Sequence, residues 1–237
     1  MISYKNQKYN VLAIVPARSG SKGIKNKNIK KINKIPLLGF TGIFIKKLNF
    51  IDNAVCSTDS KLYAKLAKNY GLDTPFLRPV SLSGDRIGDV DVLKHALLRS
   101  ENYYNKKFDL VIMLQPTSPL RKVRDLVNAI NQLFINNLDA IWSVSPTDLK
   151  NHPYKQLLIS KNKLSYFSNK GKNIIARQQL EQTYQRNGIF YILKRKLVLK
   201  KLLINRKTGS YIIKDKIINI DTLKDFKEFY KIIMGKK

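Results

Sequence analysis

Cysteine is nearly absent from this sequence, and long apolar runs are missing. Cys56 is the only cysteine in 237 residues, so an intrachain disulfide is impossible and no oxidising compartment is indicated. No apolar run approaches the length of a membrane span, and the first ten residues, MISYKNQKYN, lack the apolar core of a signal peptide. We therefore expect a cytoplasmic protein with no membrane partner.

Acidic residues are also scarce, since 16 Asp and Glu stand against 45 Lys and Arg, which gives a net charge of +29. Such an excess ordinarily suggests a nucleic acid or another anionic surface as partner. Only ten of the basic residues are Arg, however, and the 35 Lys are spread along the chain among Ile and Asn. With no arginine-rich arm and no known nucleic-acid-binding motif, we expect solvated charges and no nucleic-acid partner.

A chain of 237 residues has the length of one domain with an appendage, and its hydrophobic content of 43% is enough to fill a core. Strand-like and helical segments alternate through the first 145 residues, which is typical of a parallel sheet covered by helices. The pattern predicts strands at 11–15, 53–57, 109–114, 139–144, 187–192 and 217–221. It predicts helices at 36–48, 60–70, 90–100, 123–134, 196–203 and 222–234. Between 147 and 185 the alternation stops, which indicates an insertion.

The stretch Val11–Asn28, VLAIVPARSGSKGIKNKN, combines a buried strand with a cationic loop. Its two glycines, Gly20 and Gly23, let the backbone turn tightly and bring N–H groups close to a ligand, while Arg and Lys neutralise negative charge. Neither G-x-x-x-x-G-K-[ST] nor G-x-G-x-x-G occurs here. The loop is therefore predicted to bind a polyphosphate in a different manner from either of these motifs.

Two further polar stretches lie at predicted strand ends, where α/β proteins bind ligands. Asp59 follows the strand at 53–57, and both helix capping and ligand contact remain open for it. The turn 115–121 follows the strand at 109–114 and contains two prolines, which fix a rigid non-helical conformation. It is predicted to present Gln115, Thr117, Ser118 and Arg121 at the rim of the sheet.

The loop P-A-R-S-G-S-K-G, with K-N-K-N after it, and the turn L-Q-P-T-S-P-L-R resemble two motifs of the CMP-sialic acid synthetases (acylneuraminate cytidylyltransferases). In that family the anomeric 2-hydroxyl of a nine-carbon 2-keto sugar acid attacks the α-phosphorus of CTP, and pyrophosphate leaves. The resemblance implies the same substrates here, with Mg²⁺ as cofactor. It also implies an α/β fold: a three-layer Rossmann-like nucleotidyltransferase domain, 1–146 and 187–237, with a mostly parallel sheet. Residues 147–186 would form an inserted dimerisation arm of a homodimer.

Matched onto the family's motifs, the residues divide among a few tasks. Those implied to bind CTP are Arg18, Ser21, Lys22, Lys27, Asn28, Arg78 and Ser83. Those implied to bind the sugar acid are Gln115, Ser118 and Arg186, with Lys155 and Arg177 reaching in from the arm of the second subunit. Those implied for catalysis are Arg18, Lys27 and Asp221, and those for the metal are Asp221 and Asn219. Because nucleotidyl transfer needs alignment and charge neutralisation, no covalent catalysis is expected from these groups.

Two positions depart from the family's pattern. The family's metal motif is Asp-x-Asp-Thr, whereas this chain has Asn219-Ile220-Asp221-Thr222, so one carboxylate becomes an amide that keeps an oxygen but loses a charge. Near the sugar site the family has Tyr-Arg-x-Asn-Gly, whereas Tyr184-Gln185-Arg186-Asn187-Gly188 moves the arginine by one residue. In an extended segment that shift reverses the direction of the side chain, which disfavours N-acetylneuraminate as the substrate.

Three alternatives remain open. The substrate can be a bacterial relative of sialic acid, such as legionaminic or pseudaminic acid. The chain can be a catalytically impaired nucleotide-binding homologue, an interpretation that Asn219 favours. The enzymes specific for the eight-carbon acid Kdo fit less well, because their motif after the central strand differs from Q-P-T-S-P.

Overall fold

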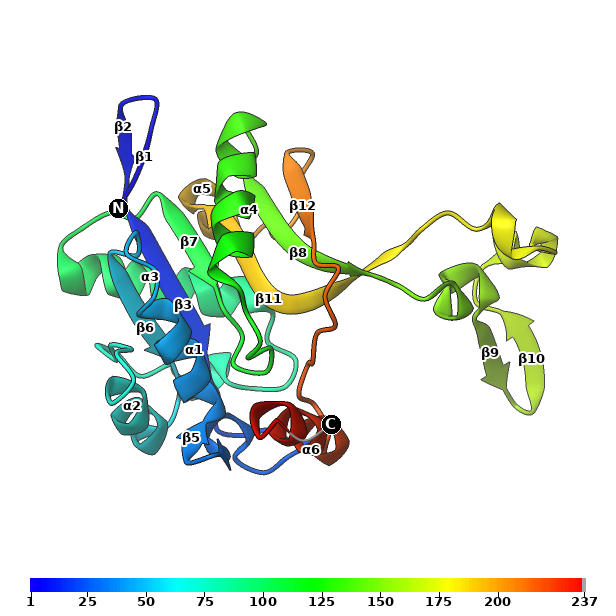
Figure 1. The fold of residues 1–237 in the computed structure, drawn as a ribbon, viewed down its shortest axis with the longest axis horizontal. Helices are drawn as coiled ribbons and strands as arrows, with labels where there is room; N and C mark the ends of the chain where they lie inside the picture. Colours follow the sequence, from blue (N-terminus) through cyan, green and yellow to red (C-terminus); the bar gives the residue numbers. More distant parts are fainter. Residues whose placement is uncertain (236–237) are drawn as a thin grey trace.

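A six-stranded sheet forms the centre of the computed structural model, which describes residues 1–235 (Figure 1). Its strands are β3 (Val11–Pro16), β6 (Asn53–Ser57), β7 (Leu110–Met113), β8 (Ala140–Pro146), β11 (Tyr184–Lys194) and β12 (Thr208–Ile212), in the order β12-β8-β11-β7-β3-β6. β11 pairs antiparallel with both of its neighbours, whereas the other strands share one direction. The sheet is therefore mixed but mostly parallel, in agreement with the sequence pattern.

Helices cover both faces of this sheet and make three layers (Figure 1). Alternate residues of β3 face opposite sides: Val11, Ala13 and Val15 join one apolar cluster, and Leu12 and Ile14 join the other. The first cluster includes residues of α1 (Leu37–Ile45), α2 (Lys61–Lys68) and α4 (Val123–Ile135), and the second includes residues of α3 (Asp89–Tyr104) and α5 (Arg195–Leu199). An uninterrupted apolar strand is what burial on both faces requires.

A third apolar cluster joins the C-terminal helix α6 (Leu223–Ile233) to the loop region. Phe229 of α6 packs there with Ile24, Ile218 and Ile220. Thr222 begins the helix with a capping box, in which its Oγ1 accepts from Asp225 N at 3.3 Å and the Asp225 carboxylate accepts from Thr222 N at 2.8 Å. The C-terminal residues are thereby held next to a loop that lies some two hundred residues earlier in the chain.

The predicted strand at 217–221 is wrong, because this segment belongs to no sheet. It is extended, with Ile218 and Ile220 buried and Asn219 and Asp221 exposed, and Ile220 N donates to Thr117 O at 2.8 Å. Alternation of apolar and polar residues indicates a half-buried extended segment, but it does not specify a pairing partner. β12 pairs with β8 at that edge of the sheet instead, and the sequence pattern missed it.

The remaining elements are short. Three two-stranded hairpins are β1 (Ile2–Tyr4) with β2 (Gln7–Tyr9), β4 (Lys31–Ile32) with β5 (Ile35–Pro36), and β9 (Leu157–Ser160) with β10 (Lys163–Tyr166). The single-turn helices are η1 (Lys27–Ile29), η2 (Val80–Leu82), η3 (Leu149–Asn151), η4 (Pro153–Lys155), η5 (Asn169–Asn173) and η6 (Arg177–Gln179). Within residues 1–235 there is no helix with the length and apolar character that crossing a membrane requires.

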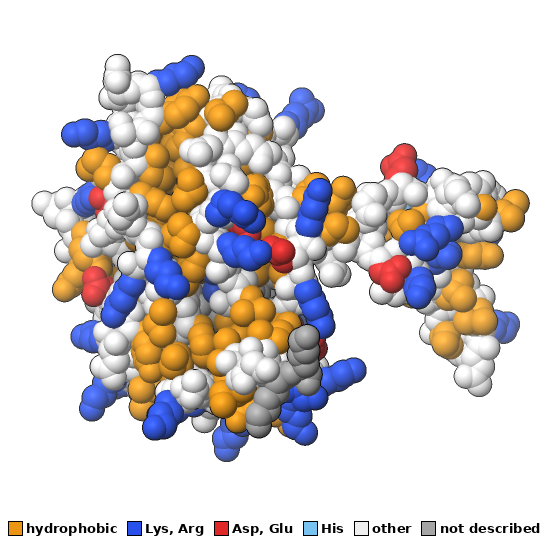
Figure 2. Space-filling model, viewed as in Figure 1, with side chains coloured by type: hydrophobic (Ala, Val, Ile, Leu, Met, Phe, Trp, Pro, Cys, Tyr) orange, Lys and Arg blue, Asp and Glu red, His pale blue; other side chains and the backbone are white. Residues whose placement is uncertain are grey.

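Residues 147–183 leave the body between β8 and β11 and extend away from it as an arm (Figure 1). The β8–β11 pairing reaches Pro146 opposite Tyr184 at its base. Figure 2 shows the arm as a separate lobe with apolar side chains on its surface. In its hairpin, Ile159 and Leu164 face each other across the strands and are 75% and 68% exposed.

Candidate active site

A cavity of about 600 Å³ opens at the carboxyl ends of β3 and β7. Four segments line it: the loop after β3, the segment 78–92, the turn after β7, and residues 219–221. The predicted site residues that line it are Arg18, Ser21, Lys22, Lys27, Asn28, Arg78, Gln115, Asn219 and Asp221. The parallel register of β3 with β7 brings the two motifs to the same edge of the sheet.

The loop after β3 is fixed at several points. Ser19 donates to Asp59 through its backbone N and its Oγ, each at 2.8 Å, and Asn28 Nδ2 donates to the carbonyl of Arg18 at 3.0 Å. Asp59 therefore holds the loop, while the neighbouring Ser60 caps α2 by accepting from Tyr63 N at 3.4 Å. Of the two roles open for Asp59, capping is thus wrong, and its contact is with the chain itself.

Gly23 has a steric reason to be glycine. A Cβ at this position would lie 2.6 Å from the backbone carbonyl oxygen of Asp221, which is too close for any side chain. The loop and the segment that carries Asn219 and Asp221 therefore touch backbone to backbone. This contact places the cationic loop directly beside the predicted metal residues.

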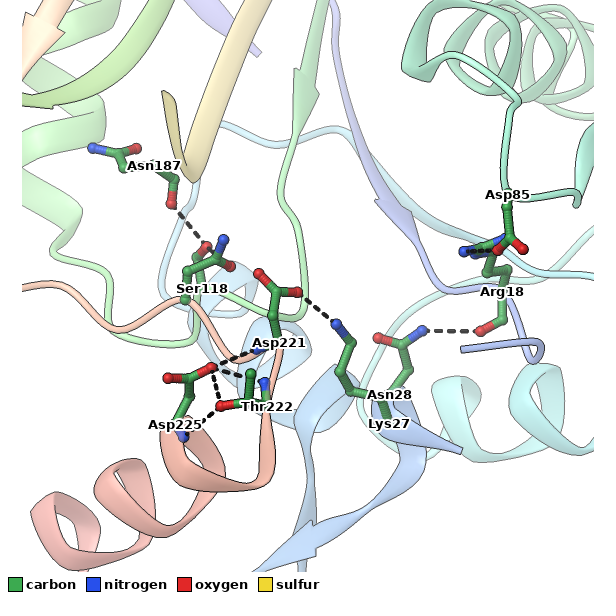
Figure 3. Close-up of polar contacts among 10 residues, drawn as sticks. Arg18, Lys27, Asn28, Asp85, Ser118, Asn187, Asp221, Thr222 and Asp225 are labelled. Atoms are coloured by element: carbon green, nitrogen blue, oxygen red, sulfur yellow. Dashed lines mark hydrogen bonds and ion pairs between the residues drawn. The ribbon is translucent and has the colours of Figure 1, made fainter. Parts of the chain in front are cut away.

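Asp85 pairs with two of the loop's cations. Its carboxylate lies 2.6 Å from Arg18 Nη2 (Figure 3). It also lies 2.6 Å from Lys22 Nζ, and both cations lower the pKa of Asp85. Arg18 Nη1 also donates to the backbone carbonyl of Ser83 at 3.4 Å. The Asp85 carboxylate is thus bound to the two cations, Arg18 and Lys22, that the sequence predicts to bind the triphosphate. Any polyanion that binds Arg18 and Lys22 has to compete with it.

Lys27 and Asp221 both line the cavity and form an ion pair, with the Lys27 Nζ 2.8 Å from the Asp221 Oδ1 (Figure 3). The Oγ of Ser118 donates to the carbonyl of Asn187 at 2.9 Å and lies 3.3 Å from the Oδ1 of Asn219. Ser118 is fully buried and does not itself line the cavity. The Asp221 carboxylate and the Asn219 amide side chain both line the cavity beside the cationic loop.

The carboxylate of Asp221 and the amide of Asn219 are compatible with a Mg²⁺ site. No cluster of three or more His, Cys, Asp or Glu side chains suited to a metal occurs within residues 1–235. Magnesium commonly binds through one or two carboxylates, with waters and substrate phosphates completing its octahedron. Asp221 and Asn219 fit a site of that kind, which would be complete only when a phosphate is bound.

The cavity lining also includes Arg78, Asp89 and the apolar side chains of Leu82, Ile87 and Val92. Arg78 is 5% exposed, and burial lowers the pKa of its guanidinium, partly offset by nearby Asp59. Asp89 begins α3, and burial raises the pKa of its carboxyl group, opposed by Arg186 and Arg78. The cavity therefore offers apolar side chains as well as the cations of the loop.

Arg121 is half-buried and does not line the cavity, which corrects the prediction that the turn presents it at the rim. Its guanidinium donates to the carbonyls of Ile189 at 2.7 Å and of Gln115, and to Thr41 Oγ1 at 3.2 Å. Burial without a carboxylate partner lowers its pKa to about 9. Arg121 thereby holds the turn in place, while Gln115 lines the cavity.

The other predicted residues lie elsewhere. Ser83 donates its Oγ to the carbonyl of Pro79 at 3.1 Å, away from the cavity wall. Lys155 and Arg177 are exposed on the arm, and no part of the arm lines this cavity. Arg186 is exposed on β11, with its guanidinium carbon 5.7 Å from the ring centre of Trp142. Within one chain, the structure does not bring these cations to the cavity.

Sequence reasoning predicted Asp221 but missed two other acidic residues that line the cavity. Asp85 and Asp89 lie in a stretch without clear periodicity, so pattern analysis gave them no role. Their rarity was a usable signal, because the chain has only 16 acidic residues against 45 basic ones. An Asp retained in such a background, close to a cationic loop, is a candidate for a specific contact.

A cationic loop and an acidic segment at the carboxyl edge of a mostly parallel sheet define the class of α/β nucleotide-binding proteins. The family model described as "Cytidylyltransferase" matches residues 12–233, nearly the whole chain. The chain therefore belongs to the cytidylyltransferase family and is a nucleotidyltransferase.

Individual relatives agree with this membership. The chain is 33% identical over 220 residues to post-translational flagellin modification protein B of Campylobacter coli, covering 92% of each chain. It is 32% identical over 219 residues to CMP-N,N'-diacetyllegionaminic acid synthase of Campylobacter jejuni, also covering 92% of each. Among solved structures, CMP:2-keto-3-deoxy-manno-octonic acid synthetase complexed with CTP superposes with a TM-score of 0.70 over 95% of this chain and 99% of that one. At 12% identity, this last likeness shows the fold alone.

Proposed function

We propose that this protein transfers CMP from CTP to the anomeric 2-hydroxyl of a nonulosonic acid, a nine-carbon 2-keto sugar acid of the sialic type, and releases pyrophosphate. The observation that carries the proposal is the single cavity in which the cationic loop, Arg78 and Asp221 meet, in a chain of the cytidylyltransferase family. The sugar oxygen forms a bond to the α-phosphorus as the bond to the pyrophosphate oxygen breaks, and the hydroxyl proton is released. We place this reaction in the cytoplasm.

Charge neutralisation is the main task that the chain's residues perform in this reaction. Arg18, Lys22 and Lys27 bind the triphosphate, together with Ser21 and the backbone N–H groups of the loop. Lys27 has a side chain that is only 14% exposed, so its charge is poorly screened by solvent where the α-phosphate would lie. Asn28 binds the ribose, and Arg78 binds the cytosine. The triphosphate displaces Asp85 from Arg18 and Lys22.

Asp221 and Asn219 would hold Mg²⁺, and the metal would supply further neutralisation of phosphate charge. Asp221 also pairs with Lys27, so metal binding and the position of Lys27 would be linked. Because Asn219 brings no charge, the chain's own share of the site has one negative charge. We therefore expect Mg²⁺ to bind mainly together with the nucleotide.

We propose that the sugar acid binds near Gln115 and Arg186, and that the protein acts as a homodimer. In the dimer, Lys155 and Arg177 of the second subunit's arm would approach the carboxylate of the sugar acid. The exposed apolar side chains of the arm support this arrangement, because monomeric proteins rarely leave such a cluster in solvent. Residues 147–186 would then be the dimerisation arm, with 1–146 and 187–237 as the CTP-binding domain.

The acid itself is proposed to be of the legionaminic or pseudaminic type rather than N-acetylneuraminate. The shifted position of Arg186 supports this choice, because that side chain faces Trp142 in the structure. The C. jejuni relative is named for a legionaminic acid derivative, at 32% identity.

Pyrophosphate release from CTP, measured with a panel of acids, tests the function. The panel contains N,N'-diacetyllegionaminic acid, pseudaminic acid and N-acetylneuraminic acid, with Kdo as the control for chain length. We expect release with one of the first two acids and little with the others. CTP binding without release from any of these acids would instead identify a nucleotide-binding homologue that has lost its activity, the alternative that Asn219 favours.

A further inference from the structure

Residues 79–87, here called the strap, lead from Arg78 to the start of α3. The strap residues that line the cavity are Leu82, Gly84, Asp85 and Ile87. No residue of the strap is buried, and none belongs to an apolar cluster. Its backbone hydrogen bonds, such as that from Ser83 N to Val80 O at 2.9 Å, join strap residues to each other. Packing alone therefore holds the strap weakly.

Three polar contacts join the strap to the rest of the described chain, residues 1–235, and all three use cations of the loop after β3. Arg18 Nη2 lies 2.6 Å from the Asp85 Oδ1 (Figure 3). Arg18 Nη1 donates to the carbonyl of Ser83 at 3.4 Å, and Lys22 Nζ lies 2.6 Å from the Asp85 Oδ2. The side chains that anchor the strap are thus two of those predicted to bind the triphosphate.

Asp85 competes for these cations with only one negative charge, whereas a triphosphate or a pyrophosphate carries several. The Asp85 side chain is 36% exposed, so solvent screens both of its ion pairs and each is weak. A polyphosphate can therefore displace Asp85, and its affinity is reduced by the free energy of the two ion pairs that it breaks. A ligand that does not reach Arg18 and Lys22 leaves Asp85 in place and loses no affinity.

We propose that Asp85 acts as an internal competitor of the outer phosphates, which lowers the affinity for CTP and for pyrophosphate alike and thereby favours release of pyrophosphate after the transfer. The inference rests on the proposed function, in which Arg18 and Lys22 bind the triphosphate. It extends that function to product release, because Asp85 returns to both cations as pyrophosphate leaves. The strap is freed when the polyphosphate binds and is anchored again when it departs.

Calorimetry tests the competition by comparing wild type with Asp85→Asn, without metal or sugar acid, so that no turnover occurs. The probes are CTP, pyrophosphate and CMP, of which CMP has the base, the ribose and one phosphate but lacks the outer phosphates. The matched control is Asp91→Asn, which also removes a carboxylate paired with a lysine, in this case Lys201 outside the cavity. Thermal unfolding confirms that each variant is folded.

We expect Asp85→Asn to bind CTP and pyrophosphate about 2- to 30-fold more tightly than wild type, the range for two exposed ion pairs. Its affinity for CMP should stay that of wild type, and Asp91→Asn should match wild type with all three probes. Unchanged, weaker or undetectable pyrophosphate binding in folded Asp85→Asn overturns the assignment. An equal gain in affinity for CMP also overturns it, because the carboxylate would then repel any phosphate without competing for the two cations.

Hydrogen exchange of the backbone amides in residues 80–87, followed by mass spectrometry, tests the anchoring of the strap. Exchange should be faster in Asp85→Asn than in wild type, and pyrophosphate should accelerate it in wild type. Unchanged or slower exchange of wild type on adding pyrophosphate would show that Asp85 does not anchor the strap. If both measurements agree with expectation but no acid supports pyrophosphate release from CTP, the proposed function fails while the role of Asp85 stands.

Discussion

Apolar side chains are buried in the body of this protein, whereas several are exposed in its arm. β11 begins at the base of the arm: Tyr184 at its start is exposed, whereas Ile189 to Leu193 are buried within the sheet. In the body most apolar strand residues pack in one of the clusters, but in the arm Ile159 and Leu164 lie in solvent. The body therefore buries its apolar strands within one chain, while the hairpin of the arm leaves apolar side chains exposed.

The two regions also differ in how they use charge. In the body, Arg18 and Lys22 share Asp85, and Lys27 pairs with Asp221. No ion pair within residues 1–235 involves an arm residue from Thr147 to Thr183. Arg18, Lys22 and Lys27 are therefore positioned by carboxylates of the chain itself, whereas the described cations of the arm form no ion pair with a described residue.

The largest effect is expected from Arg18→Ala in the body. Removing this guanidinium from the triphosphate site should reduce turnover by at least about 100-fold, as loss of a charge-stabilising donor does in other enzymes. Oligomeric state and melting temperature should stay those of wild type, because Arg18 belongs to no apolar cluster. Lys25→Ala is the control, since Lys25 is an exposed cation of the same loop that does not line the cavity. Near-normal turnover in Arg18→Ala would remove the assignment of the phosphate loop.

An intermediate effect is expected in the arm from the paired change Ile159→Asp with Leu164→Asp. These residues lie opposite each other in the hairpin, so two charges replace the exposed apolar surface. We expect the mass in solution, measured by light scattering, to fall from dimer to monomer. The free energy of unfolding of the body should change little, whereas Ile192→Ala in the core should lower it by about 2–5 kcal/mol. A double variant that stays dimeric would show that the arm does not form the interface.

The smallest effect is expected from Asn219→Asp. A second carboxylate beside Asp221 restores charge to the metal site, so the Mg²⁺ concentration for half-maximal activity should fall by several-fold. Ser118 remains within reach of the new side chain at about the same distance, so no loss of stability is expected. A titration of activity against Mg²⁺ measures the change. Unchanged or weaker Mg²⁺ dependence would show that position 219 is not a ligand.

The sequence predicted best where a local pattern determines both conformation and chemistry. The loop 16–28 and the turn 115–121 were recognised because glycine, proline and cations fix the backbone and the ligand type together. Burial of β3 on both faces followed directly from its apolar run. These features depend on neighbours in the chain, so a single sequence is enough to recognise them.

Prediction failed where contacts between distant segments decide the outcome. The segment 217–221 has the alternation of a strand, yet it docks on the loop and on α6, and β12 takes the sheet edge. Arg121 was expected at the rim, but it bonds to the carbonyl of Ile189, 68 residues away in the chain, and does not line the cavity. A role for Asp85 and Asp89 can be recognised only after folding has placed them near Arg18 and Arg78. Neither the hydrophobic periodicity nor a motif of the sequence predicts these contacts.

The contact between Gly23 and the carbonyl of Asp221 has a consequence for the order in which the protein acquires its site. The two residues are 198 positions apart (221 minus 23), and each forms one wall of the same cavity. A ribosome releases the phosphate loop well before the wall that contains Asp221. The nascent chain therefore has no complete pocket until residue 221 has been added. A transcript truncated before codon 221 encodes a loop without the surface that faces it.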